Sequence, residues 1–262
     1  MLPFAVSISL LGLLQAALVA LPGRLPDLPL AGFPSRWWAL VPAMSIVVVI
    51  GIVNFYEDSA TALSYLALVA VPPLAAVALG LLVPGSRPSL AVATVPLFAI
   101  AWATTDSLVG EAAATALTAL ACITLGWLLV SVVPALWLRL GVYAMAAVDT
   151  WFVAGDLLQG PNAVLSAASP AADLPRLQVV HFGSARMGFG DLFAAALVGC
   201  LLAIPADGPK SEEIIRFSAH RQMVAAGLVA ILALVFDLLF FAVDTLPATV
   251  PVAVALALTA RR

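Results

Sequence analysis

Charged residues are scarce in this sequence, and their scarcity excludes most classes of soluble protein. Asp, Glu, Lys and Arg make up 10% of the 262 residues, whereas they make up about 25% of a typical soluble domain. Hydrophobic residues account for 64% of the chain, and the mean hydropathy is +1.15. We therefore predict an all-α polytopic membrane protein, with the lipid bilayer as its surroundings.

Cysteine, histidine and clustered basic residues are scarce as well. The two cysteines, Cys122 and Cys200, lie in apolar runs without Cys-x-x-Cys spacing, so the sequence indicates neither a disulfide framework nor a zinc site. The 11 Lys and Arg residues are scattered and the net charge is −3, which leaves no basic patch for nucleic acid. We expect no metal, no cofactor and no nucleic-acid partner.

Apolar runs separated by turn signals recur along the whole chain. A spanning helix needs roughly 20 mostly apolar residues, and pairs such as Pro22-Gly23 and Gly160-Pro161 break the runs. The pattern predicts about nine transmembrane helices. These cover residues 3–22, 37–55, 61–83, 89–105, 112–132, 135–158, 177–204, 222–243 and 246–260. We expect one integral membrane unit, in which residues 1–134 hold the first five helices and residues 135–262 hold the last four. The last run begins with Pro247, which predicts an irregular entry to its helix.

The basic residues sort to one side of this arrangement. Nine of the 11 fall on the same side: Arg24, Arg36, Arg87, Arg139, Lys210, Arg216, Arg221, Arg261 and Arg262. Only Arg176 and Arg186 fall on the other. Because cytoplasmic loops are enriched in Lys and Arg, we expect the amino terminus outside and the carboxyl terminus in the cytoplasm. Abundant Ala, Leu and Val with few lysines suggest a GC-rich prokaryotic gene, and hence a prokaryotic plasma membrane.

Two aspartates that interrupt apolar runs are the main candidates for chemistry. Asp149 lies within one predicted helix, and Asp191 lies at the start of the apolar part of the next. A charge at the bilayer centre costs roughly 2.5–3.5 kcal/mol on insertion scales, so chains keep one there mainly for catalysis or transport. Antiparallel packing of the two helices would bring the carboxyls together. Two carboxyls that share one proton can activate water and protonate a leaving amine.

The residues before the second aspartate allow a substrate to approach it. Gly188, Phe189 and Gly190 precede Asp191, and glycines, which lack Cβ, permit a close backbone approach or an irregular helix start. Two alternatives stay open on these residues alone. Asp191 could act only as a helix cap, and a proton-coupled secondary transporter would also keep both buried aspartates. A third acid, Asp237, lies in the predicted eighth helix, where we expect it to pair with a basic residue or to hydrate a path to the dyad.

These residues resemble the GxGD intramembrane aspartyl proteases, the family that includes presenilin and signal peptide peptidase. Val148-Asp149 resembles the site of the first aspartate, Gly188 to Asp191 matches the GxGD motif, and Pro247-Ala248-Thr249 resembles the Pro-Ala-Leu motif. The similarity covers about residues 130–260. It departs from the family pattern at Val148, where the family usually has Tyr, and at Thr249, where it has Leu.

The resemblance implies an enzyme that hydrolyses peptide bonds within transmembrane segments or remnant signal peptides, with Asp149 and Asp191 as its catalytic residues. Substrate binding would involve Gly188, Phe189, Gly190, Pro247, Ala248 and Thr249. The orientation expected from the basic residues is that of signal peptide peptidase, which implies substrates whose amino end is cytoplasmic. Prepilin peptidases also carry GxGD, but the basic residue that usually follows their motif is replaced here by the apolar stretch that begins at Leu192. We therefore do not expect prepilin processing.

Overall fold

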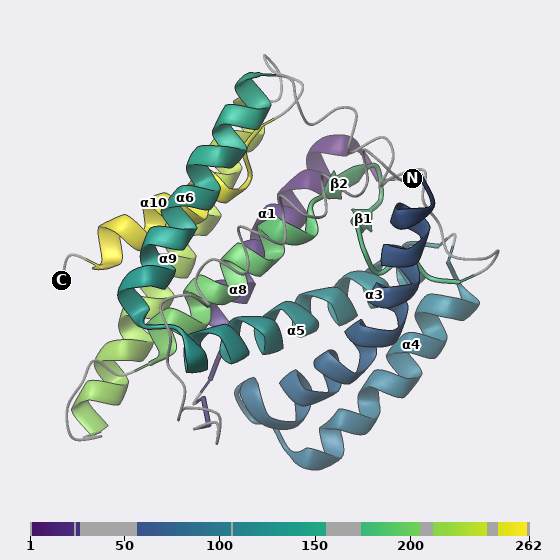
Figure 1. Cartoon of the computed structure of the whole chain (residues 1–262), viewed down its shortest axis with the longest axis horizontal. Helices are drawn as coiled ribbons and strands as arrows, with labels where there is room; N and C mark the ends of the chain where they lie inside the picture. Colours follow the sequence, from purple (N-terminus) through teal and green to yellow (C-terminus); the bar gives the residue numbers. More distant parts are fainter. Residues whose placement is uncertain are drawn as a thin grey trace.

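The computed structural model describes residues 2–23, 25–26, 57–105, 107–155, 174–204, 212–239 and 246–260. Most of these residues are helical (Figure 1). The helices are α1 (Phe4–Ala20), α3 (Glu57–Val77), α4 (Thr94–Ala103), α5 (Leu108–Val132), α6 (Ala135–Ala154), α8 (Phe189–Ala203), α9 (Glu212–Leu239) and α10 (Thr249–Ala260). A π-helical segment, Ala78–Leu82, extends α3, and a 3₁₀ segment, Pro88–Ala93, leads into α4. The helix predicted over residues 37–55 lies outside the described residues.

The lengths of the helices support the predicted membrane class. In the described part of the chain, four helical stretches are long and apolar enough to cross a membrane, namely Thr61–Leu82, Leu108–Val132, Ala135–Ala154 and Ser218–Leu239. Four shorter apolar helices accompany them: Phe4–Ala20, Pro88–Ala103, Phe189–Ala203 and Thr249–Thr259. Each of these eight stretches overlaps a predicted apolar run. The protein therefore has the composition and the helices of an all-α membrane protein.

The prediction of one continuous helix over residues 177–204 is wrong over residues 177–188. Strands β1 (Val180–Phe182) and β2 (Ala185–Met187) form an antiparallel hairpin there, and Val180 pairs with Met187. Gly183, at the turn, has φ +64°, a conformation that glycine adopts without steric cost. Hydropathy alone does not separate a short apolar strand from a helical turn, so the pattern hid the hairpin. Helix α8 begins only at Phe189.

Proline and serine set several helix ends. Ser107 caps α5, since its Oγ accepts a hydrogen bond of 3.1 Å from the Gly110 N–H. Pro134, between α5 and α6, has no N–H to continue the first helix and has a backbone conformation suited to starting the second. Pro247 precedes α10, which begins at Thr249. The irregular entry predicted at Pro247 is therefore confirmed.

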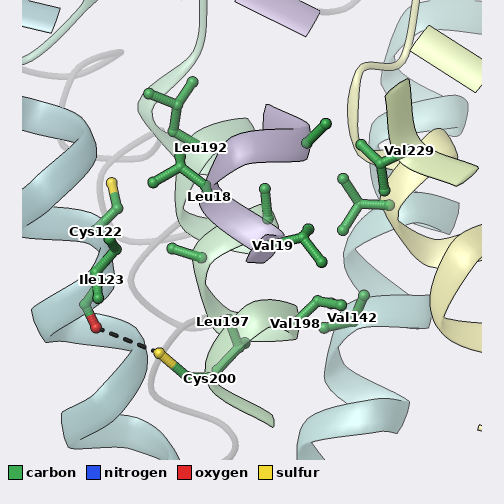
Figure 2. Close-up of a cluster of buried hydrophobic side chains, with 14 of the residues drawn as sticks. Leu18, Val19, Cys122, Ile123, Val142, Leu192, Leu197, Val198, Cys200 and Val229 are labelled. Atoms are coloured by element: carbon green, nitrogen blue, oxygen red, sulfur yellow. Dashed lines mark hydrogen bonds between the residues drawn. The ribbon is translucent and has the colours of Figure 1, made fainter. Parts of the chain in front are cut away.

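Helix α8 forms the centre of the main hydrophobic core. It contacts α1, α5, α6, α9 and α10, and α1 and α8 lie in the middle of the view, between α3 and α4 on one side and α9 and α10 on the other (Figure 1). Figure 2 shows Leu18 and Val19 of α1 among core residues of α5, α6, α8 and α9. Thus α1 packs against α8 and α9, which lie far from it in the sequence.

Glycines allow the helices around α8 to approach closely. A Cβ on Gly199 of α8 would lie 2.6 Å from the Leu18 carbonyl oxygen, and a Cβ on Gly126 of α5 would lie 3.2 Å from the backbone of Leu197. Small residues serve this purpose in membrane helices, where van der Waals packing replaces a hydrophobic driving force. The contact between α5 and α8 also carries a polar link, because the Cys200 thiol donates to the Ile123 carbonyl oxygen at 3.5 Å (Figure 2).

Candidate active site

Asp191 lies in the first turn of α8 and is half-buried. Its Oδ2 accepts a hydrogen bond of 3.2 Å from the Gly188 N–H. A carboxylate in the first turn that reaches back to the residue before the helix satisfies a backbone donor that the helix leaves unpaired. The capping role considered for Asp191 is therefore present locally. It uses only a fraction of the acceptor capacity of the carboxylate, so the group remains available for chemistry.

Asp149, near the end of α6, is held by the first residue of α10. Its Oδ2 accepts hydrogen bonds from the Thr249 hydroxyl at 2.7 Å and from the Thr249 N–H at 3.3 Å. A first-turn N–H has no partner within its own helix, so the aspartate caps α10 from a different helix. Thr249, where the resemblance would place Leu, thus contributes two hydrogen bonds to the first aspartate, and a leucine could contribute only the backbone one.

The two aspartates lie on helices that contact each other and share α10 as a neighbour. Helix α10 packs against both α6 and α8, and the carboxyl groups of Asp149 and Asp191 are close enough to interact electrostatically. The amide of Gln15, on α1, joins the same region: its Nε2 donates to the Ala248 carbonyl oxygen at 3.2 Å and to the Asp191 carbonyl oxygen at 3.4 Å. The structure therefore brings together three segments that the sequence separates widely.

The two glycines of the GxGD motif precede Asp191 and are accessible at the surface of the described structure. Gly188 and Gly190 are both exposed. A Cβ on Gly188 would lie 3.0 Å from Asp191 Oδ2, whereas a Cβ on Gly190 would meet no atom within 4 Å. Phe189, between them, is half-buried and packs against the main core. Among the described residues, the backbone at Gly190 is therefore open to a small added side chain, next to Asp191 in the chain.

Pro247 and Ala248, the other predicted substrate-binding residues, are half-buried at the entry to α10, and Ala248 packs against the main core. Thr249 is buried, at 5% exposure. All three lie in the segment that contacts the aspartates, since Thr249 binds Asp149 and the Ala248 carbonyl shares the Gln15 amide with Asp191. Their contact with a substrate stays a prediction.

The hairpin that precedes the GxGD motif is fastened to α5. Glu111 Oε2 accepts from the Gly183 N–H at 2.7 Å, and its Oε1 lies 3.0 Å from His181 Nδ1. The hydroxyls of Thr115 and Thr118 donate to the carbonyl oxygens of His181 and Leu177. Helix α5 therefore packs against β1. These contacts fix the position of the hairpin that leads to Gly188.

Sequence reasoning missed Gln15 and did not foresee the serine that binds Asp237. Gln15 is the one amide in the apolar run over residues 3–22, a signal that could have marked it, because an amide in hydrocarbon needs hydrogen-bond partners. Asp237 was expected to pair with a basic residue or to hydrate a path. Its Oδ2 accepts from the Ser9 hydroxyl of α1 at 2.8 Å, and a basic partner or a hydrated path stays a prediction.

No group of three or more His, Cys, Asp or Glu side chains gathers at one point in the described ranges. The acids at this site form a pair, and such a pair is suited to moving protons. Comparisons of the chain with protein families, with curated proteins and with solved structures give no match.

Proposed function

We propose that this protein is an intramembrane aspartyl protease of the presenilin and signal peptide peptidase type, which hydrolyses peptide bonds in transmembrane segments or remnant signal peptides. One observation carries the proposal. Asp149 and Asp191, from different helices, are both linked to the Ala248 to Thr249 turn, the first by Thr249 directly and the second through Gln15, as a GxGD dyad next to a Pro-Ala-Leu-like turn would be. Two carboxylic acids in an apolar setting are the machinery of aspartyl hydrolysis.

In the proposed reaction, the two aspartates share one proton. The ionised member takes a proton from water as the water oxygen attacks the scissile carbonyl carbon, and the protonated member donates a hydrogen bond to the carbonyl oxygen. When the tetrahedral intermediate collapses, the C–N bond breaks and a proton from the dyad passes to the leaving amine. Because the two groups titrate together, the proton belongs to the pair and is assigned to neither member.

A substrate helix must unwind before this can happen, since its carbonyls are hydrogen-bonded within the helix. Unpaired backbone groups cost several kcal/mol each in lipid, so the enzyme has to supply partners. In the proposal, the unwound segment adds as a strand beside β2 and the Pro247 to Thr249 segment. We choose β2 over β1 because backbone carbonyls in and before β1, those of His181 and Leu177, already accept hydrogen bonds from threonines of α5.

The topology belongs to the same proposal. We place about nine spans in the membrane, made of the four long helical stretches and the four shorter apolar helices of the described residues and the apolar run over residues 37–55. The amino terminus then lies outside and the carboxyl terminus in the cytoplasm of a prokaryote. The preferred substrates then have cytoplasmic amino ends. Epitope tags inserted between residues 205 and 211 should be accessible from the cytoplasm, and tags accessible only from outside would reverse the orientation.

A proton-coupled secondary transporter is the second candidate, and it is favoured by the same two acids in membrane helices. Conservative replacement separates the two functions. Asp149→Asn and Asp191→Asn keep the size of each side chain but remove its proton exchange. If the protein is a protease, either variant in proteoliposomes loses hydrolysis of a single-span substrate. If it is a transporter, wild type shows no hydrolysis, and the variants retain solute flux that no longer depends on a proton gradient.

A further inference from the structure

Gln15 connects the backbone at Asp191 with the turn before α10, whose next residue, Thr249, binds Asp149. It lies on α1, is 1% exposed, and donates from one nitrogen to the Asp191 carbonyl oxygen at 3.4 Å and to the Ala248 carbonyl oxygen at 3.2 Å. Ala248 directly precedes Thr249, which donates twice to Asp149. A continuous path of contacts thus runs from one aspartate to the other through a side chain of the first helix.

From this path we infer that Gln15 is a positioning residue, which sets the separation of Asp149 and Asp191 by holding the Ala248 to Thr249 turn against the start of α8. The inference rests on the proposed protease function and adds a residue of α1 to its machinery. Gln15 acts through Thr249 and through the backbone of Asp191, and it does not contact the reacting atoms.

The chemistry of the side chain suits this role. A primary amide has two N–H donors at a fixed angle on one nitrogen, so a single planar group can serve two carbonyls from different helices. In apolar surroundings these hydrogen bonds are strong, and an amide without partners is costly. Helix α1 packs against α8 and α9 along its length, which fixes the position from which Gln15 reaches the site.

Gln222 offers a matched control within the same chain. It is also a buried glutamine, 6% exposed, and its Nε2 donates to the carbonyl oxygens of Val19 and Pro22 at 2.9 and 2.8 Å. It therefore fastens α9 to the end of α1 without contacting the residues of the dyad or the turn. Gln15→Met and Gln222→Met remove the same chemical group and keep a similar side-chain length.

The test compares cleavage of a single-span substrate by wild type, Gln15→Met and Gln222→Met in detergent, with thermal unfolding of each protein. We expect Gln15→Met to lower kcat on the order of 10- to 100-fold, the cost of misplacing reacting groups by about 1 Å, while KM stays close to the wild-type value. We expect Gln222→Met to lower the unfolding temperature and keep kcat. If Gln222→Met does not fold, Ser218→Ala, which removes a hydroxyl that donates to Leu202, takes its place.

A double variant supplies a readout that a purely structural role would not change. Because Gln15 acts through the turn, Gln15→Met combined with Thr249→Val should lose less kcat than the product of the two single losses. Wild-type kcat in a folded Gln15→Met protein, or fully multiplicative losses, would overturn the inference and leave the protease function standing. No cleavage by wild type would instead remove the protease function, and the role of Gln15 with it.

Discussion

The two helices that carry the aspartates differ sharply in how they are held. In α8, ten of 15 residues are buried, and five other helices contact it. In α6, three of 20 residues are buried, and Val148 and Trp151, on either side of Asp149, are 45% and 72% exposed. Asp191 therefore lies on a helix that is fixed by packing, while the position of Asp149 depends on its hydrogen bonds to Thr249.

This contrast gives each helix a different task in the proposed mechanism. Side chains in a close-packed interior sit in well-defined positions, so α8 can provide a rigid reference for Asp191. A helix with few buried contacts opens at a lower cost in free energy, and α6 can shift to admit a substrate from the lipid. Helix α10 then returns Asp149 to its place through Thr249.

The largest difference in stability should appear when a glycine is replaced by alanine in α8 and, for comparison, in α6. Gly199→Ala in α8 places its Cβ 2.6 Å from the Leu18 carbonyl oxygen, and we expect it to lower the free energy of unfolding by about 1–3 kcal/mol. Gly141→Ala in α6 meets no atom within 4 Å, and we expect it to raise stability by about 0.5–1 kcal/mol. Unfolding in mixed micelles measures both, and equal effects would erase the distinction between the helices.

Removal of the Thr249 hydroxyl should weaken the interaction that positions Asp149 of α6. Thr249→Val loses the 2.7 Å hydrogen bond to Asp149, and a bond to a charged group contributes about 1.5–3 kcal/mol, so we expect kcat/KM to fall roughly tenfold or more. Thr249→Ser keeps the hydroxyl and most of the activity. Thr259→Val is the control in the same helix, because that hydroxyl binds Ala255 of α10 itself. Thr249→Val with wild-type kinetics would show that Asp149 is held in some other way.

A side chain at Gly190 should interfere with the substrate without disturbing the fold. Gly190→Val meets no atom within 4 Å of its Cβ, and neither does Gly227→Val on α9, so both should unfold at similar temperatures. Only the first variant fills the space beside Asp191, and we expect its KM to rise by about tenfold, the effect of one or two methyl groups on a fitted pocket. Equal KM values for the two variants would place the substrate elsewhere.

Asp237 should give the smallest effect. Asp237→Asn keeps an oxygen that can accept from Ser9 and removes only the charge, so we expect stability to change by less than about 0.5 kcal/mol and cleavage to continue. Loss of cleavage in a folded Asp237→Asn protein would make this acid a third member of the proton chemistry and would end the description of the site as a pair.

The sequence predicted the parts of this molecule that depend on local composition. Hydropathy located the helices of the described chain, and Pro247 marked the broken entry to α10. The aspartates stood out because acids are rare in apolar runs. The hairpin at Val180 was missed, since its apolar residues continue the helical pattern. The partners of Gln15 and Thr249 were missed because they follow from packing between distant helices, which no local pattern records.

Cleavage of a purified single-span substrate in detergent tests the central claim most directly, with product masses read by mass spectrometry for wild type, Asp149→Ala and Asp191→Ala. The account predicts a defined cut within the apolar segment by wild type, unchanged by a metal chelator, and no product from either folded variant. Equal cleavage by all three proteins, or none by wild type across several substrates, would contradict an aspartyl dyad at Asp149 and Asp191.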